Sequence, residues 1–206
     1  ENYVYNNDFE VSRTDTSSQV LTAALYICGG PKYFGGQFYD NRITTNVPAA
    51  WIASFYGGAS NSDLYNNIIT PLNQAKFSTF RIGSAGCGEC VAKNIKFRSN
   101  NIEGQNFSLD VTDQDHSYSV YWTLNLTVKD LKNLSLKNTE ITILNRLNEI
   151  AFRGKTDPLG QITAELPQYS VDGKNKKVFS PYIIKTGIIT KEIELDNNKE
   201  IIIKFQ

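Results

Sequence analysis

Near its start the chain reads Tyr3-Val4-Tyr5-Asn6-Asn7-Asp8-Phe9, and shortened versions of this stretch recur three times in the first half of the sequence. The recurrences are Tyr39-Asp40-Asn41-Arg42-Ile43, Tyr65-Asn66-Asn67-Ile68-Ile69 and Arg98-Ser99-Asn100-Asn101-Ile102. The asparagines that mark them, Asn7, Asn41, Asn67 and Asn100, are separated by 34, 26 and 33 residues. This spacing is typical of a structural repeat with variable insertions rather than of chance.

The repeat units also share their ends, because the apolar segments of the first three units close on glycines at Gly29, Gly57 and Gly83. A unit of this size cannot bury its own apolar face, so the units are expected to stack. Over residues 1–130 the pattern resembles the right-handed parallel β-helix family. This resemblance implies that each turn supplies short strands and that apolar residues stack inside. It also implies a ladder of asparagines at one turn, formed here by Asn7, Asn41, Asn67 and Asn100.

From about Leu136 the pattern changes to short strands joined by tight turns, which is typical of an antiparallel β-sandwich. The segment Thr156-Asp157-Pro158-Leu159-Gly160 resembles a turn of the carboxypeptidase-regulatory-like, transthyretin-like β-sandwiches. Domains of that family are mostly accessory, and the resemblance carries over no catalytic residue. The sequence therefore predicts an all-β chain with two domains: a parallel β-helix (solenoid) end over residues 1–135 and a small antiparallel β-sandwich over residues 136–206.

The composition favours a turn-rich β protein and excludes some classes of function. The formal net charge of the 206 residues is zero and the pI is near 6.9, so there is no overall electrostatic attraction to nucleic acid or to anionic lipid. No apolar run is long enough to cross a bilayer. Residues 1–130 hold nine Lys/Arg and 12 Asp/Glu, and residues 131–206 hold 12 and nine, so the two parts carry charges of −3 and +3. Such a shift in composition is what two domains produce.

The sharpest local motif is Cys87-Gly88-Glu89-Cys90. A C-x-x-C motif can close as a local disulfide, stay as two free thiols, or bind a metal. A zinc site would need Cys28 and His116 as well, but Cys28 lies 59 residues before Cys87, about two repeats away along the stack. We favour the Cys87–Cys90 disulfide and interpret Cys28 as a small buried apolar residue.

A cluster of acidic residues follows in the segment 110–116. Asp110, Asp113 and Asp115 would supply the oxygen ligands that calcium prefers, and His116 beside them could serve as a base. The spacing lacks the glycine and the distal glutamate of an EF-hand loop. A solvated turn is the plainer interpretation, and the sequence requires no cofactor; calcium is the one cofactor that it suggests.

Many aromatic residues fall at positions expected to face outward, where they could stack on sugar rings or on one another. These residues are Tyr33, Phe34, Tyr39, Tyr56, Tyr65, Tyr118 and Tyr121. Stacking within the core and along ladders is the commoner role for such residues. They therefore suggest, without requiring it, a glycan-binding surface.

The sequence contains no catalytic set that we recognise: nucleophile elbows, phosphate-binding loops and dinucleotide fingerprints are missing. The expected function is therefore a non-enzymatic structural or adhesive module of an extracellular, cell-surface protein. Its partners would be glycans or other surface proteins, and it would act within a larger assembly. The alternative is the C-terminal part of a β-helix polysaccharide lyase or glycoside hydrolase whose catalytic repeats lie upstream of Glu1. Because a repeat begins at Tyr3, we expect the chain to be a piece of a longer protein.

Overall fold

The structure, a computed structural model, describes residues 2–14, 22–29, 35–72, 77–113 and 115–205. These residues form strands and turns but no helix, which confirms the all-β expectation. Within these ranges there is accordingly no helix that could cross a membrane. The chain divides into two compact units, Glu1–Ser119 with Val171–Lys176 and Val120–Ser170 with Lys177–Gln206.

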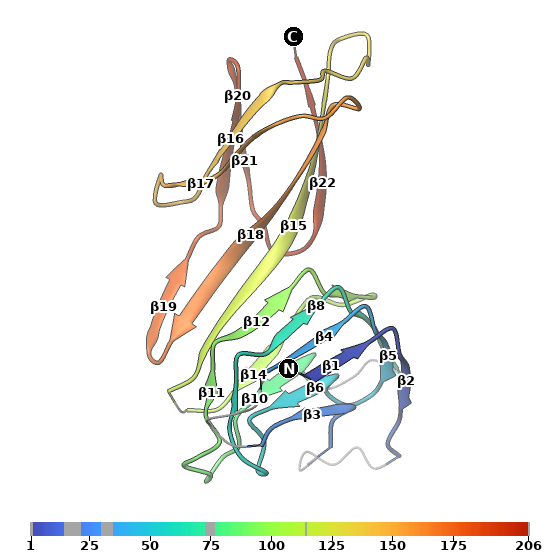
Figure 1. Cartoon of the computed structure of the whole chain (residues 1–206), viewed down its shortest axis with the longest axis vertical. Helices are drawn as coiled ribbons and strands as arrows, with labels where there is room; N and C mark the ends of the chain where they lie inside the picture. Colours follow the sequence, from blue (N-terminus) through green and yellow to red (C-terminus); the bar gives the residue numbers. More distant parts are fainter. Residues whose placement is uncertain (1, 15–21, 30–34, 73–76, 114, 206) are drawn as a thin grey trace. The chain divides into compact units, whose positions relative to one another are not determined.

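In the first unit, short strands from successive repeats pair in parallel (Figure 1). One row consists of β1 (Asn2–Tyr5), β4 (Gly36–Tyr39), β8 (Asp63–Tyr65) and β12 (Ile95–Arg98). A second row consists of β2 (Asp8–Val11), β5 (Arg42–Thr45), β9 (Ile68–Pro71) and β13 (Asn101–Ile102). A third row consists of β3 (Leu25–Ile27), β6 (Ala50–Ile52), β10 (Phe80–Ile82) and β14 (Leu109–Val111). A parallel pair adds β7 (Ala59–Ser60) and β11 (Ala92–Lys93).

The register of these rows places equivalent residues of successive repeats side by side. In the second row Ile43 pairs with Ile69, and in the third row Ile52 pairs with Ile82. All four of these isoleucines are buried, as are Phe80 and Phe97, whose ring centroids lie 4.9 Å apart. The apolar residues of each repeat therefore pack on their counterparts, which is how units that are too small to fold alone obtain a shared core.

A left-handed backbone conformation precedes each marker asparagine. The residues concerned are Asn6, Asp40, Asn66 and Ser99, whose φ angles are 53°, 54°, 54° and 52°. Asparagine and aspartate tolerate this conformation better than most residues because their short polar side chains can hydrogen-bond locally. The recurring Asn-Asn, Asp-Asn and Ser-Asn pairs thus have a backbone cause: the first residue turns the chain and the second forms the ladder.

Replacing Asp40 tests this explanation. Asp40 is exposed and its backbone N–H donates to the carbonyl of Tyr65, so only its conformation is demanding. We expect Asp40→Val to lower the free energy of unfolding by about 1–2 kcal/mol, because a β-branched residue is strained at positive φ. Asp40→Asn is the matched control and should leave stability nearly unchanged. Urea unfolding curves that do not separate the two variants would contradict the explanation.

The second unit has longer strands arranged in two groups. One group holds β15 (Ser117–Lys129) between β18 (Gln161–Asp172) and β22 (Lys199–Lys204), with β22 parallel to β15. The other is an antiparallel sheet in the order β17 (Ile150–Lys155), β16 (Glu140–Leu144), β20 (Tyr182–Thr186) and β21 (Ile189–Ile193). The remaining strand, β19 (Asn175–Val178), follows β18.

Strand β15 shows why this unit has a core of its own. Its buried positions fall on every second residue, and they are Val120, Trp122, Leu124, Leu126 and Val128. Ile141 and Ile143 of β16 and Tyr182 of β20 are also buried, so both groups contribute apolar residues. Period-two burial of this kind is typical of strands with one face on a core.

These observations correct the solenoid expected over residues 1–135. The repeat pattern assigns Val120–Val128 to a fourth repeat of the solenoid, but residues 117–129 form one strand of 13 residues, because their apolar alternation is continuous. The first unit also includes Val171–Lys176, so it is not a contiguous run of repeats. The architecture is an all-β fold with both parallel and antiparallel sheets. The division between residues 119 and 120 also differs from the boundary expected between 135 and 136.

Candidate functional site

The four marker asparagines are joined by a chain of hydrogen bonds. The side-chain oxygen of Asn41 accepts from the backbone N–H and the Nδ2 of Asn7, both at 3.1 Å. Asn67 accepts from Asn41 in the same way at 3.1 and 3.0 Å, and Asn100 accepts from Asn67 at 3.1 and 2.9 Å. Asn41, Asn67 and Asn100 also donate from Nδ2 to backbone carbonyls of the neighbouring repeat, so the buried amides are well satisfied.

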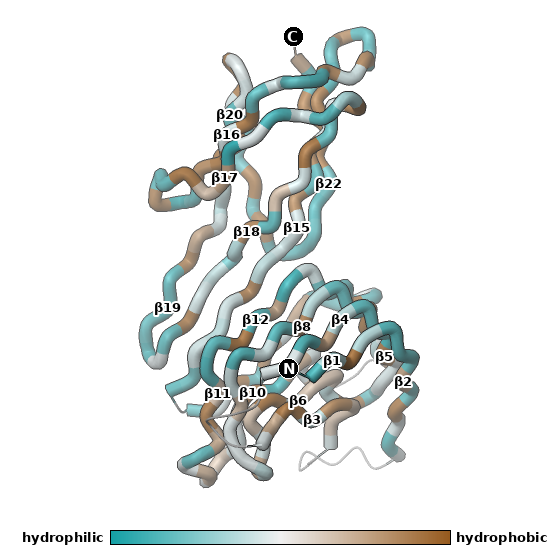
Figure 2. Tube along the Cα trace, in the orientation of Figure 1, coloured by the Kyte–Doolittle hydropathy of each residue, from teal (hydrophilic) through white to brown (hydrophobic). Residues whose placement is uncertain are grey.

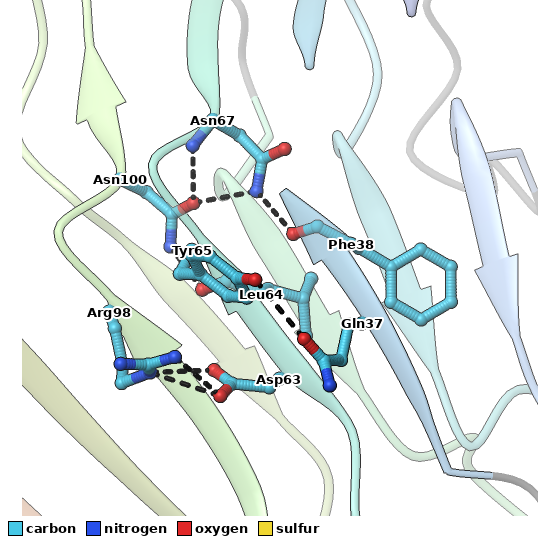
Figure 3. A network of polar contacts seen from close by, with 8 residues as sticks. All are labelled: Gln37, Phe38, Asp63, Leu64, Tyr65, Asn67, Arg98 and Asn100. Atoms are coloured by element: carbon cyan, nitrogen blue, oxygen red, sulfur yellow. Dashed lines mark hydrogen bonds and ion pairs between the residues drawn. The ribbon is translucent and has the colours of Figure 1, made fainter. Parts of the chain in front are cut away.

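A row of aromatic rings runs beside this ladder on the first row of strands. Tyr5 stacks on Tyr39 with ring centroids 5.1 Å apart, and Tyr39 stacks on Tyr65 at 4.7 Å, with the ring planes of both pairs nearly parallel. The guanidinium of Arg98 lies 4.6 Å from the centroid of the Tyr65 ring and continues the row. Asp63 holds that guanidinium through hydrogen bonds of 2.8–3.0 Å (Figure 3). The row therefore ends in a cation–π contact and an ion pair.

This stacking bears on the suggestion that outward aromatics bind sugars. The faces of Tyr39 and Tyr65, which a sugar ring would need, are already used by their neighbours. Tyr56 contacts Tyr26 and Phe55 edge-on or at a tilt. Tyr121 is half-buried. Tyr33 and Phe34 lie outside the described residues, so the structure gives no account of them.

A second contact of this kind lies on the third row and was missed by the sequence reasoning. Trp51, Arg81 and Asp110 occupy equivalent positions in successive repeats. The guanidinium carbon of Arg81 lies 4.4 Å from the Trp51 ring centroid, and its Nε lies 3.4 Å from a carboxylate oxygen of Asp110. Aligning the third-row strands of the repeats would have predicted this contact. Asp110 therefore forms an ion pair with Arg81.

Cys87 and Cys90 are joined by a disulfide bond in the structure, and Cys28 is a free, half-buried thiol. The disulfide closes the loop between β10 and β11, where Cys90 N–H donates to the carbonyl of Cys87. Cys28 and His116 are not gathered around this pair. Across the described residues, no three His, Cys, Asp or Glu side chains are arranged to hold a metal ion, and this includes Asp110, Asp113 and Asp115.

An open cleft of about 710 Å³ lies beside the disulfide loop. Its polar lining includes Asp113, Asp115 and Lys174, and Gly88 and Tyr118 contribute to its walls. Both carboxylates and Lys174 are exposed, so all three charged groups could contact a polar ligand in the cleft. The volume falls in the range of small-molecule sites.

The lining of the cleft also includes His116, the single histidine of the chain, which is buried. Its Nδ1 accepts a hydrogen bond from the backbone N–H of Ala92 at 3.0 Å, and its Nε2 lies 3.2 Å from the hydroxyl oxygen of Thr112. The carbonyl of His116 accepts from the N–H of Gly173. An imidazole that accepts at Nδ1 is neutral and protonated at Nε2. These bonds make His116 a structural link between segments.

The electrostatic surroundings keep His116 neutral. Burial lowers the pKa of His116 below its ordinary value of 6.5, the nearby Lys93 ammonium lowers it further, and Asp115 acts in the opposite direction. Protonation of Nδ1 would also place two N–H donors against each other at Ala92. The charged form is therefore disfavoured in the folded protein.

This leads to a prediction about pH. Because the pKa is lower in the folded than in the unfolded chain, the stabilising contribution is present above about pH 6.5 and is lost as the pH falls towards the folded-state pKa. We expect the melting temperature to fall between about pH 7.5 and pH 5.5. His116→Gln should flatten this dependence, since no other histidine is present. An unchanged slope in the variant would show that other groups are responsible.

Comparisons with known proteins give only distant similarities. No family model and no curated protein matches the chain. It is similar to a mutant of the shaft pilin SpaA from Lactobacillus rhamnosus GG, with 18% identity, 41% of this chain and 46% of that chain covered, and a TM-score of 0.35. The Bacillus anthracis TIE protein matches with 23% identity, coverages of 48% and 19%, and a TM-score of 0.35. A mutant of BcpA, the major pilin subunit of Bacillus cereus, matches with 12% identity and a TM-score of 0.25. The match covers 41% of this chain and 28% of that chain.

The matched regions span less than half the length of each of these structures. Two of these three structures are pilins, and the third is the TIE protein. The chain forms antiparallel as well as parallel sheets, and residues 117–129 form one long strand. The resemblance to the right-handed parallel β-helix family, followed by a carboxypeptidase-regulatory-like or transthyretin-like domain, is therefore wrong as a family assignment. The assignment was based on repeat spacing. Regular spacing accounts for the aligned strand register and the asparagine ladder, but it does not define a protein family.

Proposed function

We propose that this chain is a non-enzymatic structural or adhesive module of an extracellular, cell-surface protein. The observation that supports this proposal best is that the polar and aromatic side chains of successive repeats bind and stack on one another. The asparagine ladder, the stacked tyrosines and the Arg98–Asp63 pair all connect successive repeats. Side chains that stabilise their neighbours in this way suit a rigid scaffold, whereas catalytic groups are directed at a substrate.

The Cys87–Cys90 disulfide supports the extracellular part of this proposal. Disulfides persist in secreted and cell-surface proteins and are rare where thiol-reducing systems operate. Other surface proteins are the partners that we propose, within a larger assembly. Glycans are a second class of partner, and the cleft with Asp113, Asp115 and Lys174 is the place where we would look for them.

The proposal is tested by locating the protein and by assaying it. Protease treatment of intact cells of the source organism should release peptides from exposed parts of the chain, while a cytoplasmic marker stays intact. Incubation of the purified protein with neutral and uronate-containing glycans should release neither new reducing ends nor unsaturated uronates. Product release that disappears in Asp113→Asn and Asp115→Asn would overturn the non-enzymatic assignment and would favour a lyase or hydrolase.

A further inference from the structure

Three turns lie at the end of the second unit that carries the C-terminus, where the tube includes hydrophobic positions (Figures 1 and 2), and these turns hold four exposed large aliphatic residues. The exposed fractions are 70% for Leu131, 62% for Leu134, 64% for Leu159 and 93% for Ile188. Isolated exposed leucines are ordinary on protein surfaces. Four large aliphatic side chains on adjoining turns are unusual, and such a patch marks a contact surface. We call these four residues the apolar tip.

Several contacts show that the three turns adjoin. The backbone N–H of Val128, just before the first turn, donates to the carbonyl of Gly160 in the second turn. A Cβ on Gly160 would lie 3.2 Å from the Cβ of Ser135, at the other end of the first turn. Phe205 connects the third turn: its N–H donates to the carbonyl of Lys129, and its ring lies against Gly187. The apolar tip is thus one surface built from distant parts of the sequence.

Lysines outnumber acidic residues around the tip. Residues 129–140, 155–160, 185–188 and 204–205 hold six lysines and three acidic residues. The lysines are Lys129, Lys132, Lys137, Lys155, Lys185 and Lys204, and the acidic residues are Asp130, Asp157 and Glu140, which lies opposite Lys155. Apart from the half-buried Lys129, these lysines are exposed. Exposed aliphatic side chains with a rim of lysines fit the boundary between lipid headgroups and acyl chains of an anionic membrane.

In the two leucine-bearing turns, side chains of the same turn satisfy backbone N–H groups. The carboxylate of Asp130 accepts hydrogen bonds from the N–H groups of Lys132 and Leu134 at 2.8 and 2.9 Å. Asp157 does the same for Leu159 and Gln161 at 2.9 and 2.8 Å. Backbone N–H groups are costly to remove from water when they lack a partner. Here the turns satisfy these groups internally, so the leucines can leave water at little backbone cost.

From these observations we infer that the apolar tip docks on an anionic lipid surface, with Leu131, Leu134, Leu159 and Ile188 entering the interface and the lysines facing the headgroups. The inference concerns a surface that the proposed structural function does not use. It would place the second unit against the membrane of the cell that displays the protein, or of a cell that it contacts.

The experiment is co-sedimentation of the whole chain with vesicles. Binding is expected to vesicles of equal parts phosphatidylcholine and phosphatidylglycerol and to be much weaker with phosphatidylcholine alone. The double variant Leu134→Gln/Ile188→Gln removes two inserted side chains without adding charge, and we expect its partition coefficient to fall by roughly a hundredfold. Lys132→Gln should reduce it by roughly fivefold on the anionic vesicles only.

Leu147→Gln is the matched control. Leu147 is 47% exposed on the turn between β16 and β17, at the opposite end of β16 from the tip, so its replacement should not change binding. Thermal unfolding of each variant checks that the fold is intact. Failure of the wild-type chain to bind anionic vesicles, or equal losses in Leu147→Gln, would overturn the inference. So would a wild-type dimer in solution that the double variant dissociates without any vesicle binding, since the tip would then be a protein contact.

Discussion

Asn67→Ala should lower the free energy of unfolding by about 2–4 kcal/mol, because it breaks the ladder at a buried position. Asn67 is 2% exposed and donates to the carbonyl of Phe38 and to Asn100. It also accepts two hydrogen bonds from Asn41. Alanine removes the acceptor of the Asn41 backbone N–H and the donor to the carbonyl of Phe38, and these losses are costly at a buried position. Asn100 keeps its bond from the Asn67 backbone N–H, and Asn41 keeps its bond to the carbonyl of Val4.

The measurement is urea unfolding, with Asn101→Ala as control. Asn101 lies one residue beyond the ladder asparagine of the next repeat, is exposed, and keeps its backbone hydrogen bond to the carbonyl of Asn67 when the side chain is shortened. Its replacement should cost no more than about 0.5 kcal/mol. A loss for Asn67→Ala no greater than that of the control would mean that the ladder contributes little to stability.

Gly160→Ala is expected to have the second large effect, a loss of about 3 kcal/mol in the second unit. Gly160 has a φ of +71°, and an added Cβ would lie 2.7 Å from the carbonyl oxygen of Val128 and 3.0 Å from the backbone nitrogen of Leu136. Both neighbours are backbone atoms, so they cannot move aside as a flexible side chain would. The strain therefore has two parts, the left-handed conformation and the collision.

Gly86→Ala separates the two parts. Gly86 has a similar φ of +77°, but nothing lies within 4 Å of an added Cβ. This control should show only the conformational cost, about 1 kcal/mol. The thermal unfolding of both variants can be followed by circular dichroism. If Gly160→Ala is no less stable than Gly86→Ala, the close approach of the turn at residues 157–160 to Val128 and Leu136 is not a tight contact.

Much of the first unit could be read from the sequence because its repeats impose their own alignment. Once Asn7, Asn41, Asn67 and Asn100 are recognised as equivalent, parallel pairing brings every other equivalent set together. The tyrosine row follows from the residues two positions before each asparagine. Trp51, Arg81 and Asp110 follow from the third row by the same rule. The ladder and the strand register depend only on the spacing of equivalent residues, so the sequence predicts both.

The length of strand β15 could not be predicted from the repeat spacing. Its alternating apolar residues are visible in the sequence, but spacing assigned Val120–Val128 to a fourth repeat and did not predict a strand of 13 residues. The partner beside a strand in its sheet can lie far away in the sequence: Leu126 and Val128 pair in register with Ile201 and Ile203.

The chain's own sequence determined the all-β class, the repeat register and the left-handed turns, because these depend on residue type and spacing within each repeat. Only the tertiary structure decided the environments of individual polar and apolar groups. It separated Asp110, paired with Arg81, from Asp113 and Asp115 in the cleft. It buried His116 between Ala92 and Thr112, and it gathered Leu131, Leu159 and Ile188 at one tip. Such contacts depend on where insertions of variable length place distant segments, and no local pattern encodes that placement.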